Sequence, residues 1–210
     1  MMNSYNNSNK RKRKRRRITN EDSDDDDDDS DKNDHIEVVD NHIYFYSDVS
    51  RKSVFTLNSC FKKASQYIMR NNYQQDSDKN FIYLHIFSDG GCVFSAFAII
   101  DIIKNSKIPV VSIIEGCAAS SATMISVSCH KKVIRESAFM LIHEISGGMF
   151  GKMSDYKDEL KNMKALMKRC RKIYKKNTSL DLDNMKEQLK RDIWWGAKKC
   201  LKYGLVDEII

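Results

Sequence analysis

A serine that follows a short apolar run is the first candidate for a catalytic nucleophile in this chain. The apolar run 108–114 ends at Glu115-Gly116, and Ser120 then lies among small residues. A strand would present the hydroxyl at its end, Gly116 would permit a sharp turn, and the start of a following helix would offer free N–H groups to a developing oxyanion. Taken alone, the segment also fits small residues that only let a helix pack closely against a strand.

Two other segments supply the parts that such a nucleophile requires. The apolar run 81–87 stops at a Ser-Asp-Gly-Gly sequence, where Gly90 and Gly91 would let a backbone N–H approach a substrate carbonyl closely. The apolar run 138–142 leads to His143, shortly before another Gly-Gly pair. An imidazole has an ordinary pKa of ~6.5, which suits a general base near neutral pH. Each segment alone also fits an ordinary turn or a structural histidine.

Together these motifs resemble the ClpP family, the proteolytic subunits of the Clp protease, which are serine peptidases of the crotonase-like superfamily. The family's Ser-Pro-Gly-Gly, Gly-x-Ala-Ala-Ser and Met-Ile-His motifs correspond here to 88–91, 116–120 and 140–143. Its C-terminal Arg-Asp and Tyr-Gly-Leu-Val-Asp correspond to 191–192 and 203–207 without a gap. The resemblance covers the chain from about residue 40 to residue 210.

The resemblance implies a role for each matching residue. Ser120 would attack the scissile carbonyl, His143 would take and return its proton, and Asp192 would orient the imidazole. Ser121 is the competing nucleophile if the register shifts by one residue, and the Ala-Ala-Ser match selects Ser120. The oxyanion hole implied by the resemblance, built mainly on backbone N–H groups, consists of Gly90, Gly91 and Ser121.

The activity implied is that of a serine endopeptidase that cleaves polypeptide substrates and needs no metal or cofactor. The resemblance also implies a homo-oligomer, as a heptameric ring or as stacked rings, and an AAA+ ATPase unfoldase as a partner. Two alternatives stay open. Asp89 replaces the family's proline and brings a negative charge near the oxyanion loop, which would suit a catalytically degraded ring subunit with a structural or regulatory role. A crotonase-type acyl-CoA enzyme would share the paired-amide oxyanion hole but would need no triad.

The hydrophobic pattern predicts an α/β domain over residues 36–210, with a largely parallel sheet and, by resemblance, the ClpP/crotonase-like fold. Strands are expected at 42–47, 81–87, 108–114, 132–134, 138–143 and 205–210. Helices are expected at 53–71, 92–105, 118–128, 154–177, 181–190 and 196–202. The helix at 154–177 is amphipathic and strongly basic. The resemblance makes it a protruding handle through which two rings meet, although its charge would oppose that contact.

Residues 1–35 have the composition of a disordered tail. An unbroken basic octet from Lys10 to Arg17 precedes six consecutive aspartates at 24–29. The tail holds nine Lys and Arg against ten Asp and Glu, so the net charge of +7 lies in the domain. The octet would suit a nuclear import receptor or a nucleic acid, or it would fold back on the acidic block.

The remaining sequence features exclude several classes of protein. The six cysteines show no CxxC spacing and predict neither a metal site nor a disulfide framework. There is no secretory signal and no apolar span of about 18 residues. We therefore expect an intracellular protein, cytoplasmic or nuclear, with no membrane partner. The adjacent Trp194 and Trp195 are expected to pack around Asp192.

Overall fold

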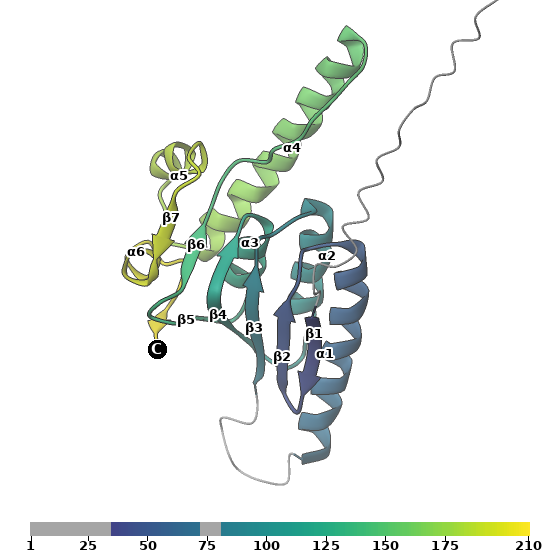
Figure 1. Cartoon of the computed structure of the whole chain (residues 1–210), viewed down its shortest axis with the longest axis vertical. Helices are drawn as coiled ribbons and strands as arrows, with labels where there is room; N and C mark the ends of the chain where they lie inside the picture. The colour runs from purple at the N-terminus through teal and green to yellow at the C-terminus, as the bar shows by residue number, and fades with distance from the viewer. Residues whose placement is uncertain (1–34, 72–80) are drawn as a thin grey trace, which may run out of the picture. The chain divides into compact units, whose positions relative to one another are not determined.

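The strands of this chain form one sheet in the part that the computed structural model describes, residues 35–71 and 81–210 (Figure 1). The strands are β1 (His35–Val39), β2 (His42–Tyr46), β3 (Ile82–Ser88), β4 (Val110–Ala119), β5 (Lys131–Ile134), β6 (Phe139–Leu141), β7 (Trp194–Gly196) and β8 (Glu208–Ile209). The helices are α1 (Arg51–Asn71), α2 (Val93–Lys104), α3 (Ser121–Val127), α4 (Met153–Asn177), α5 (Leu182–Leu189) and α6 (Ala197–Lys202). The strand order is β1-β2-β3-β4-β5-β8, and β6 pairs with β4 and β7.

Parallel pairing dominates this sheet. The strands β2, β3, β4, β5 and β8 pair with one another in parallel, and β6 runs parallel to β4. Only the β1–β2 and β6–β7 pairs are antiparallel within the described residues. Parallel neighbours need a crossover connection, and α1, α2 and α3 supply it in turn. The prediction of an α/β fold with a largely parallel sheet is confirmed.

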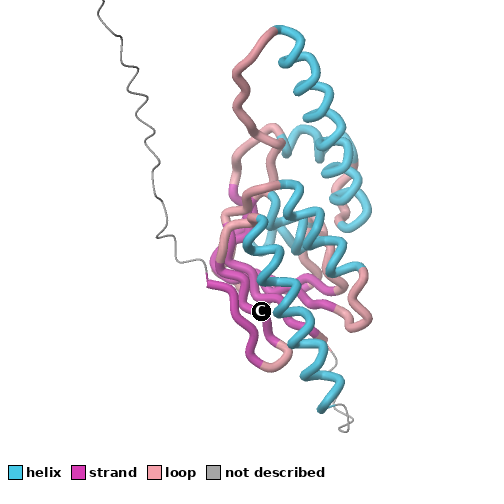
Figure 2. Tube along the Cα trace, turned by 90° about the vertical axis from the view of Figure 1, so that its right-hand side faces the viewer, coloured by secondary structure: helices cyan, strands magenta, loops and turns pink. Residues whose placement is uncertain are grey.

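The main core lies between one face of the sheet and its crossover helices. In β2, the buried Ile43 and Phe45 alternate with half-buried residues, as expected for a strand that is covered on one face. Figure 2 shows the helices gathered on one side of the strands. The buried residues of α1 recur at spacings of three and four along the helix and include Leu57, Cys60, Phe61, Ala64 and Ile68.

The long helix α4 is anchored by its second half. Its first half extends away from the sheet (Figure 1), and exposed apolar side chains such as Met153 and Leu160 lie on it. The prediction of a protruding handle helix is confirmed. The buried residues of α4 all belong to its C-terminal half and are Met167, Cys170, Ile173 and Tyr174.

The hairpin formed by β1 and β2 differs from the expectation, in which the first strand begins at residue 42. The two strands are joined by Asp40-Asn41 alone, and Asp40 has a φ of 56°. A two-residue turn of this composition between two strands is typical of a β-hairpin, so the signal was present in the sequence. The acidic composition just before it favoured a tail instead. The expectations for the tail itself, including binding through the basic octet, fall on residues 1–34 and lie outside the described residues.

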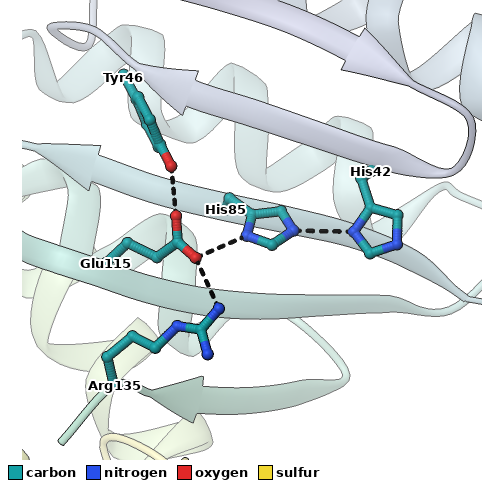
Figure 3. A network of polar contacts seen from close by, with 5 residues as sticks. All are labelled: His42, Tyr46, His85, Glu115 and Arg135. Carbon is teal, nitrogen blue, oxygen red and sulfur yellow. Dashed lines mark hydrogen bonds and ion pairs between the residues drawn. The ribbon is translucent and has the colours of Figure 1, made fainter.

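A network of polar side chains crosses the outer face of the sheet, on the side away from the main core (Figure 3). Glu115 accepts hydrogen bonds from the hydroxyl of Tyr46, from Arg135 Nη2 at 3.1 Å and from His85 Nδ1 at 3.1 Å. His85 is only 6% exposed, and its Nε2 lies 2.9 Å from His42 Nδ1. With Glu115 ionised, His85 donates from Nδ1 and accepts from His42, so each ring has one assigned tautomer. The network connects β2, β3 and β4.

We expect this network to make the fold less stable in acid. Burial raises the pKa of Glu115, but the hydrogen bonds from Tyr46, His85 and Arg135 together outweigh burial and hold that pKa below its ordinary 4.5. Burial, and then the charge of His85, lower the pKa of His42 from 6.5. Both groups therefore bind protons more weakly in the folded chain. Their contribution to stability is complete above the unfolded pKa values and is lost as the pH falls below about 6.5 for His42 and below 4.5 for Glu115.

The measurement is the melting temperature between pH 7 and pH 4. In the double variant His42→Gln, Glu115→Gln, the melting temperature should fall less between pH 7 and pH 4 than in the parent. The difference should be about 2–4 °C for each kcal/mol of pH-dependent stability that these two groups contribute. An unchanged drop in the double variant would show that other groups carry the acid sensitivity.

Candidate active site

Ser120 occupies a sharp turn between β4 and α3. Its backbone has φ 51° and ψ −122°, a conformation that costs a non-glycine residue about 1–3 kcal/mol. Three hydrogen bonds hold the turn: Ser120 N donates to Leu141 O at 2.8 Å, and Ser120 O accepts from Thr123 Oγ1 at 2.6 Å and from Thr123 N at 3.1 Å. The prediction that Gly116 makes this turn is wrong. Gly116, with φ 69°, lies inside β4, where the register against β3 shifts, and the strand continues to Ala119.

The structure brings Ser120, His143 and Asp192 into one chain of contacts. His143 Nε2 lies 2.8 Å from Ser120 Oγ, and His143 Nδ1 lies 2.7 Å from Asp192 Oδ1. Because a carboxylate can only accept, Nδ1 carries the hydrogen in the neutral imidazole and Nε2 is free to accept the serine proton. The Asp192 side chain is 78% exposed in the isolated chain.

One row of paired residues in the sheet brings these three segments together. Ala119 at the end of β4 pairs with Leu141 of β6, and Leu141 pairs with Trp194 of β7. Ser120 follows this row by one residue, His143 follows it by two, and Asp192 precedes it by two. Strand registers thus set the spacing of the three side chains. A backbone hydrogen bond of 2.7 Å from Glu144 N to Leu189 O also fixes the segment that carries His143.

The loop after β3 is held against Ser120 by its two glycines. Gly90 and Gly91 have φ values of 99° and 135°, which side chains disfavour. Val49 N donates to Gly90 O and Cys92 N donates to Val49 O, both at 2.7 Å, so neither bond uses the N–H of Gly91. The N–H of Gly90 donates to Ser88 Oγ at 3.2 Å, and this hydrogen bond stabilises the conformation of the loop.

A cavity of about 290 Å³ opens beside the serine. Gly91 and Ser121 line it together with Ser120 and His143. Ser121 is the first residue of α3, so its N–H has no acceptor within the helix. Of the three residues expected to form the oxyanion hole, Gly91 and Ser121 thus border the cavity, whereas Gly90 does not line it. The deeper wall of the cavity includes Met124, Cys170 and Tyr174.

Asp89 lies on the other side of the loop from this cavity. Its carboxylate accepts a weak hydrogen bond from Cys117 Sγ at 3.6 Å, and the two residues border a separate apolar hollow with Phe139 and Trp194. Burial, and then the charge of Asp89, raise the pKa of the Cys117 thiol to about 11. The Asp89 side chain is exposed and does not line the cavity that holds Ser120.

Replacing Asp89 with asparagine should therefore change the rate of any reaction catalysed at Ser120 by no more than about threefold, since each tenfold effect would require ~1.4 kcal/mol at the reacting atoms. Removing the charge should instead lower the pKa of Cys117. Alkylation of Cys117 followed against pH measures that shift. A rise in kcat/KM of tenfold or more in Asp89→Asn would mean that the carboxylate opposes the oxyanion after all.

The positions of Trp194 and Trp195 differ from the expectation, and the part played by Val49 was not expected. The tryptophans do not enclose Asp192: Trp195 is buried in the core against Tyr203, whereas Trp194 is half exposed on the hollow beside Asp89. They form β7, a strand of three residues that is too short to show a period. Val49, which clamps the glycine loop through its backbone, carries no chemical signal in its side chain and was missed.

Among residues 35–71 and 81–210, no group of three or more His, Cys, Asp or Glu side chains is placed to hold a metal ion. No helix in the same part of the chain has the length and apolar character that crossing a membrane requires.

A Ser–His–Asp contact chain of this kind recurs in hydrolases of several unrelated folds. The family model for Clp protease matches residues 41–210. The chain belongs to the Clp protease family, and the resemblance to ClpP seen in the sequence is confirmed.

Two relatives illustrate this similarity. The ATP-dependent Clp protease proteolytic subunit of Streptococcus mutans is 36% identical over 140 residues, which are 65% of this chain and 71% of that protein. The solved structure of a ClpP1 mutant from Listeria monocytogenes matches with a TM-score of 0.69 at 20% identity, over 81% of this chain and 91% of that chain. The second match supports the fold.

Proposed function

We propose that this protein is a serine endopeptidase in which Ser120, His143 and Asp192 form the catalytic triad. The observation that supports the proposal is the pair of contacts made by His143, 2.8 Å to Ser120 Oγ and 2.7 Å to Asp192 Oδ1. Shared membership of a peptidase family is consistent with it. The protein needs no metal or cofactor for this chemistry.

In the proposed reaction, Ser120 Oγ attacks the carbonyl carbon of the scissile bond while its proton moves to His143 Nε2. The carbonyl oxygen becomes an oxyanion that the N–H groups of Gly91 and Ser121 stabilise. His143 then gives the proton to the leaving amine, and an acyl-enzyme remains on Ser120. A water molecule attacks the acyl group with His143 again as the base, which restores the serine. Asp192 holds the imidazole in the tautomer that can accept.

The alternative of a catalytically degraded subunit loses its main support, because Asp89 lies outside the cavity that holds Ser120. The crotonase-type alternative would leave the contact chain from Ser120 through His143 to Asp192 without a purpose. We therefore favour the peptidase over both.

We further propose that the chain works as a homo-oligomeric ring, heptameric and single or stacked, which receives polypeptides from an AAA+ ATPase unfoldase. The Streptococcus mutans relative is named as an ATP-dependent proteolytic subunit. Five exposed apolar side chains lie just before α4 or in its first half: Met149, Phe150, Met153, Tyr156 and Leu160. Apolar side chains that cluster on a surface mark contacts with other chains. Sedimentation velocity measures the assembly, and a protein that stays at 24.4 kDa at all concentrations would reject the ring.

A fluorophosphonate probe tests the proposed nucleophile directly. The probe should label Ser120 in the parent protein, as mapped by mass spectrometry of the peptides, and labelling should disappear in His143→Ala. Labelling of Ser121 would move the nucleophile by one residue. A folded, assembled protein that takes no label would support a non-catalytic subunit, and thioesterase activity on acyl-CoA in Ser120→Ala would support the crotonase alternative.

A further inference from the structure

The second half of α4 carries a high concentration of positive charge. From Lys161 to Asn177 the helix has eight Lys and Arg residues and no Asp or Glu. Among residues 35–71 and 81–210, only the first of these eight forms an ion pair with a carboxylate, that of Asp158 at 3.0 Å. Four of the eight follow one another at spacings of four, three and four residues, so they share one face of the helix. This basic face consists of Lys164, Lys168, Arg171 and Lys175.

The stability of α4 does not account for the basic face. Cations in the last turn of a helix offset its dipole, and Lys175 lies in that turn. The effect of the dipole falls off within one turn, whereas Lys164 and Lys168 lie more than two turns before the end of the helix. Like charges three or four residues apart also repel one another and destabilise a helix. The pattern therefore indicates a use in binding an anionic molecule.

The basic face lies beside the cavity that opens at the serine. Cys170 and Tyr174, one turn apart on α4, form part of the cavity wall, and Arg171 stands between them in the chain. Burial raises the pKa of Cys170 to about 11, and the positive charge of Arg171 is among the effects that act against this rise, so the guanidinium lies near the thiol. On the same helix, Met167 Sδ accepts a hydrogen bond of 3.2 Å from the N–H of Ile145, which also borders the cavity. A chain bound in the cavity therefore has its neighbouring residues within reach of the basic face.

We propose that the basic face binds acidic side chains of the polypeptide substrate next to the cleaved bond, so that the protein prefers acidic polypeptide segments. This inference rests on the proposed function, because the substrate must be bound at Ser120 for its flanking residues to meet α4. An extended chain advances about 3.3 Å per residue and the basic face is about 16 Å long, so a run of several acidic residues can lie along it. Two carboxylates near the same space do not cancel this charge. Asp192 is engaged by His143, and Glu144 is a single anion at the outer edge of the cavity.

A polypeptide fits the basic face better than a nucleic acid does. None of its four residues is aromatic, so it offers no platform on which unpaired bases could stack. It also adjoins a cavity whose serine is placed to react with an acyl carbon. Double-stranded DNA, whose phosphates need no stacking platform, enters the test as a competitor.

Peptides with one cleaved core and different flanks test this preference. Runs of glutamate, glutamine or lysine on both sides of the core change the charge, and glutamate and glutamine have the same shape. At about 0.1 M salt the parent should cleave the glutamate peptide with about tenfold higher kcat/KM than the glutamine peptide, and the lysine peptide should be the slowest. The difference should lie mainly in KM, since the basic face acts on binding and not on the reacting atoms. At about 1 M salt, where the Debye length falls to ~3 Å, the three peptides should converge to within about twofold.

The triple variant Lys164→Gln, Lys168→Gln, Lys175→Gln should lose this preference, with a glutamate-to-glutamine ratio within about twofold of one. All three side chains are exposed, and glutamine forms helices about as well as lysine, so the melting temperature should match that of the parent.

Lys62→Gln, Lys63→Gln, Lys104→Gln is the matched control. It removes the same charge from exposed positions on α1 and α2 that do not border the cavity, and its peptide ratio should equal that of the parent.

Equal cleavage of the three peptides by the parent at about 0.1 M salt, or a preference that persists in the triple variant, would overturn the inference alone. The same holds if the peptides show no preference while double-stranded DNA inhibits the parent and not the triple variant, which would assign the basic face to a nucleic acid. No cleavage of any peptide together with no fluorophosphonate label would instead overturn the proposed function, and the inference with it.

Discussion

Replacing Ser120 with alanine should lower the kcat/KM for a peptide substrate by about 10⁴-fold or more. The substitution removes the atom that bonds to the substrate and leaves the oxyanion donors and the cavity in place. The residual rate should come from those groups alone. Because alanine also disfavours a φ of 51°, the melting temperature must be measured alongside, and the variant must be folded at the assay temperature.

Comparing the kcat/KM values of the single and double variants shows whether Ser120 and His143 act together in one step or contribute independently. His143→Ala should be as slow as Ser120→Ala, and the double variant should be little slower than either, since the two residues act in one step. Losses that multiply in the double variant would contradict the contact chain seen here. A Ser120→Ala protein with more than a tenth of the parent activity would show that another residue is the nucleophile.

Replacing Gly91 with alanine should have the second largest effect. The new Cβ would lie 2.6 Å from Val49 O, and the φ of 135° is nearly exclusive to glycine. The backbone must move, and the N–H that we assign to the oxyanion hole moves with it. Loss of one such donor costs about 10²–10³-fold in kcat, and the strain should lower the free energy of unfolding by about 1–3 kcal/mol.

Gly147→Ala provides the control for this substitution. A Cβ at Gly147 would meet no atom within 4 Å among the described residues, and no positive φ constrains it. Its kcat and melting temperature should match those of the parent. If Gly91→Ala retained full kcat while only its stability fell, the N–H of Gly91 would not be an oxyanion donor.

Much of the fold could be predicted from sequence because hydrophobic periodicity reports directly on buried faces. The alternation of β2 and the three-and-four spacing of α1 and α4 are read in this way, and each element lies within a few residues of its expected position. The β1 strand was missed because the acidic composition just before it favoured a tail. The β7 strand has three residues and becomes a strand through its pairing with β6, which no local window contains.

The residue types alone predict only part of the candidate site. Ser120 and His143 each follow an apolar run, so physical reasoning alone could suggest them. Asp192 follows a polar helix and was found only through the resemblance. The backbone clamp from Val49 depends on two peptide groups, which every residue has, and so left no trace in the sequence. The turn was misplaced at Gly116 because a glycine normally makes such turns, whereas here the strained residue is the serine itself.

The row formed by Ala119, Leu141 and Trp194 makes the geometry of the site depend on strand register. A slip of one residue in either pairing would turn the side chains of the shifted strand to the opposite face of the sheet. The contact chain from Ser120 through His143 to Asp192 would then be broken, even if each of the three segments kept its local conformation.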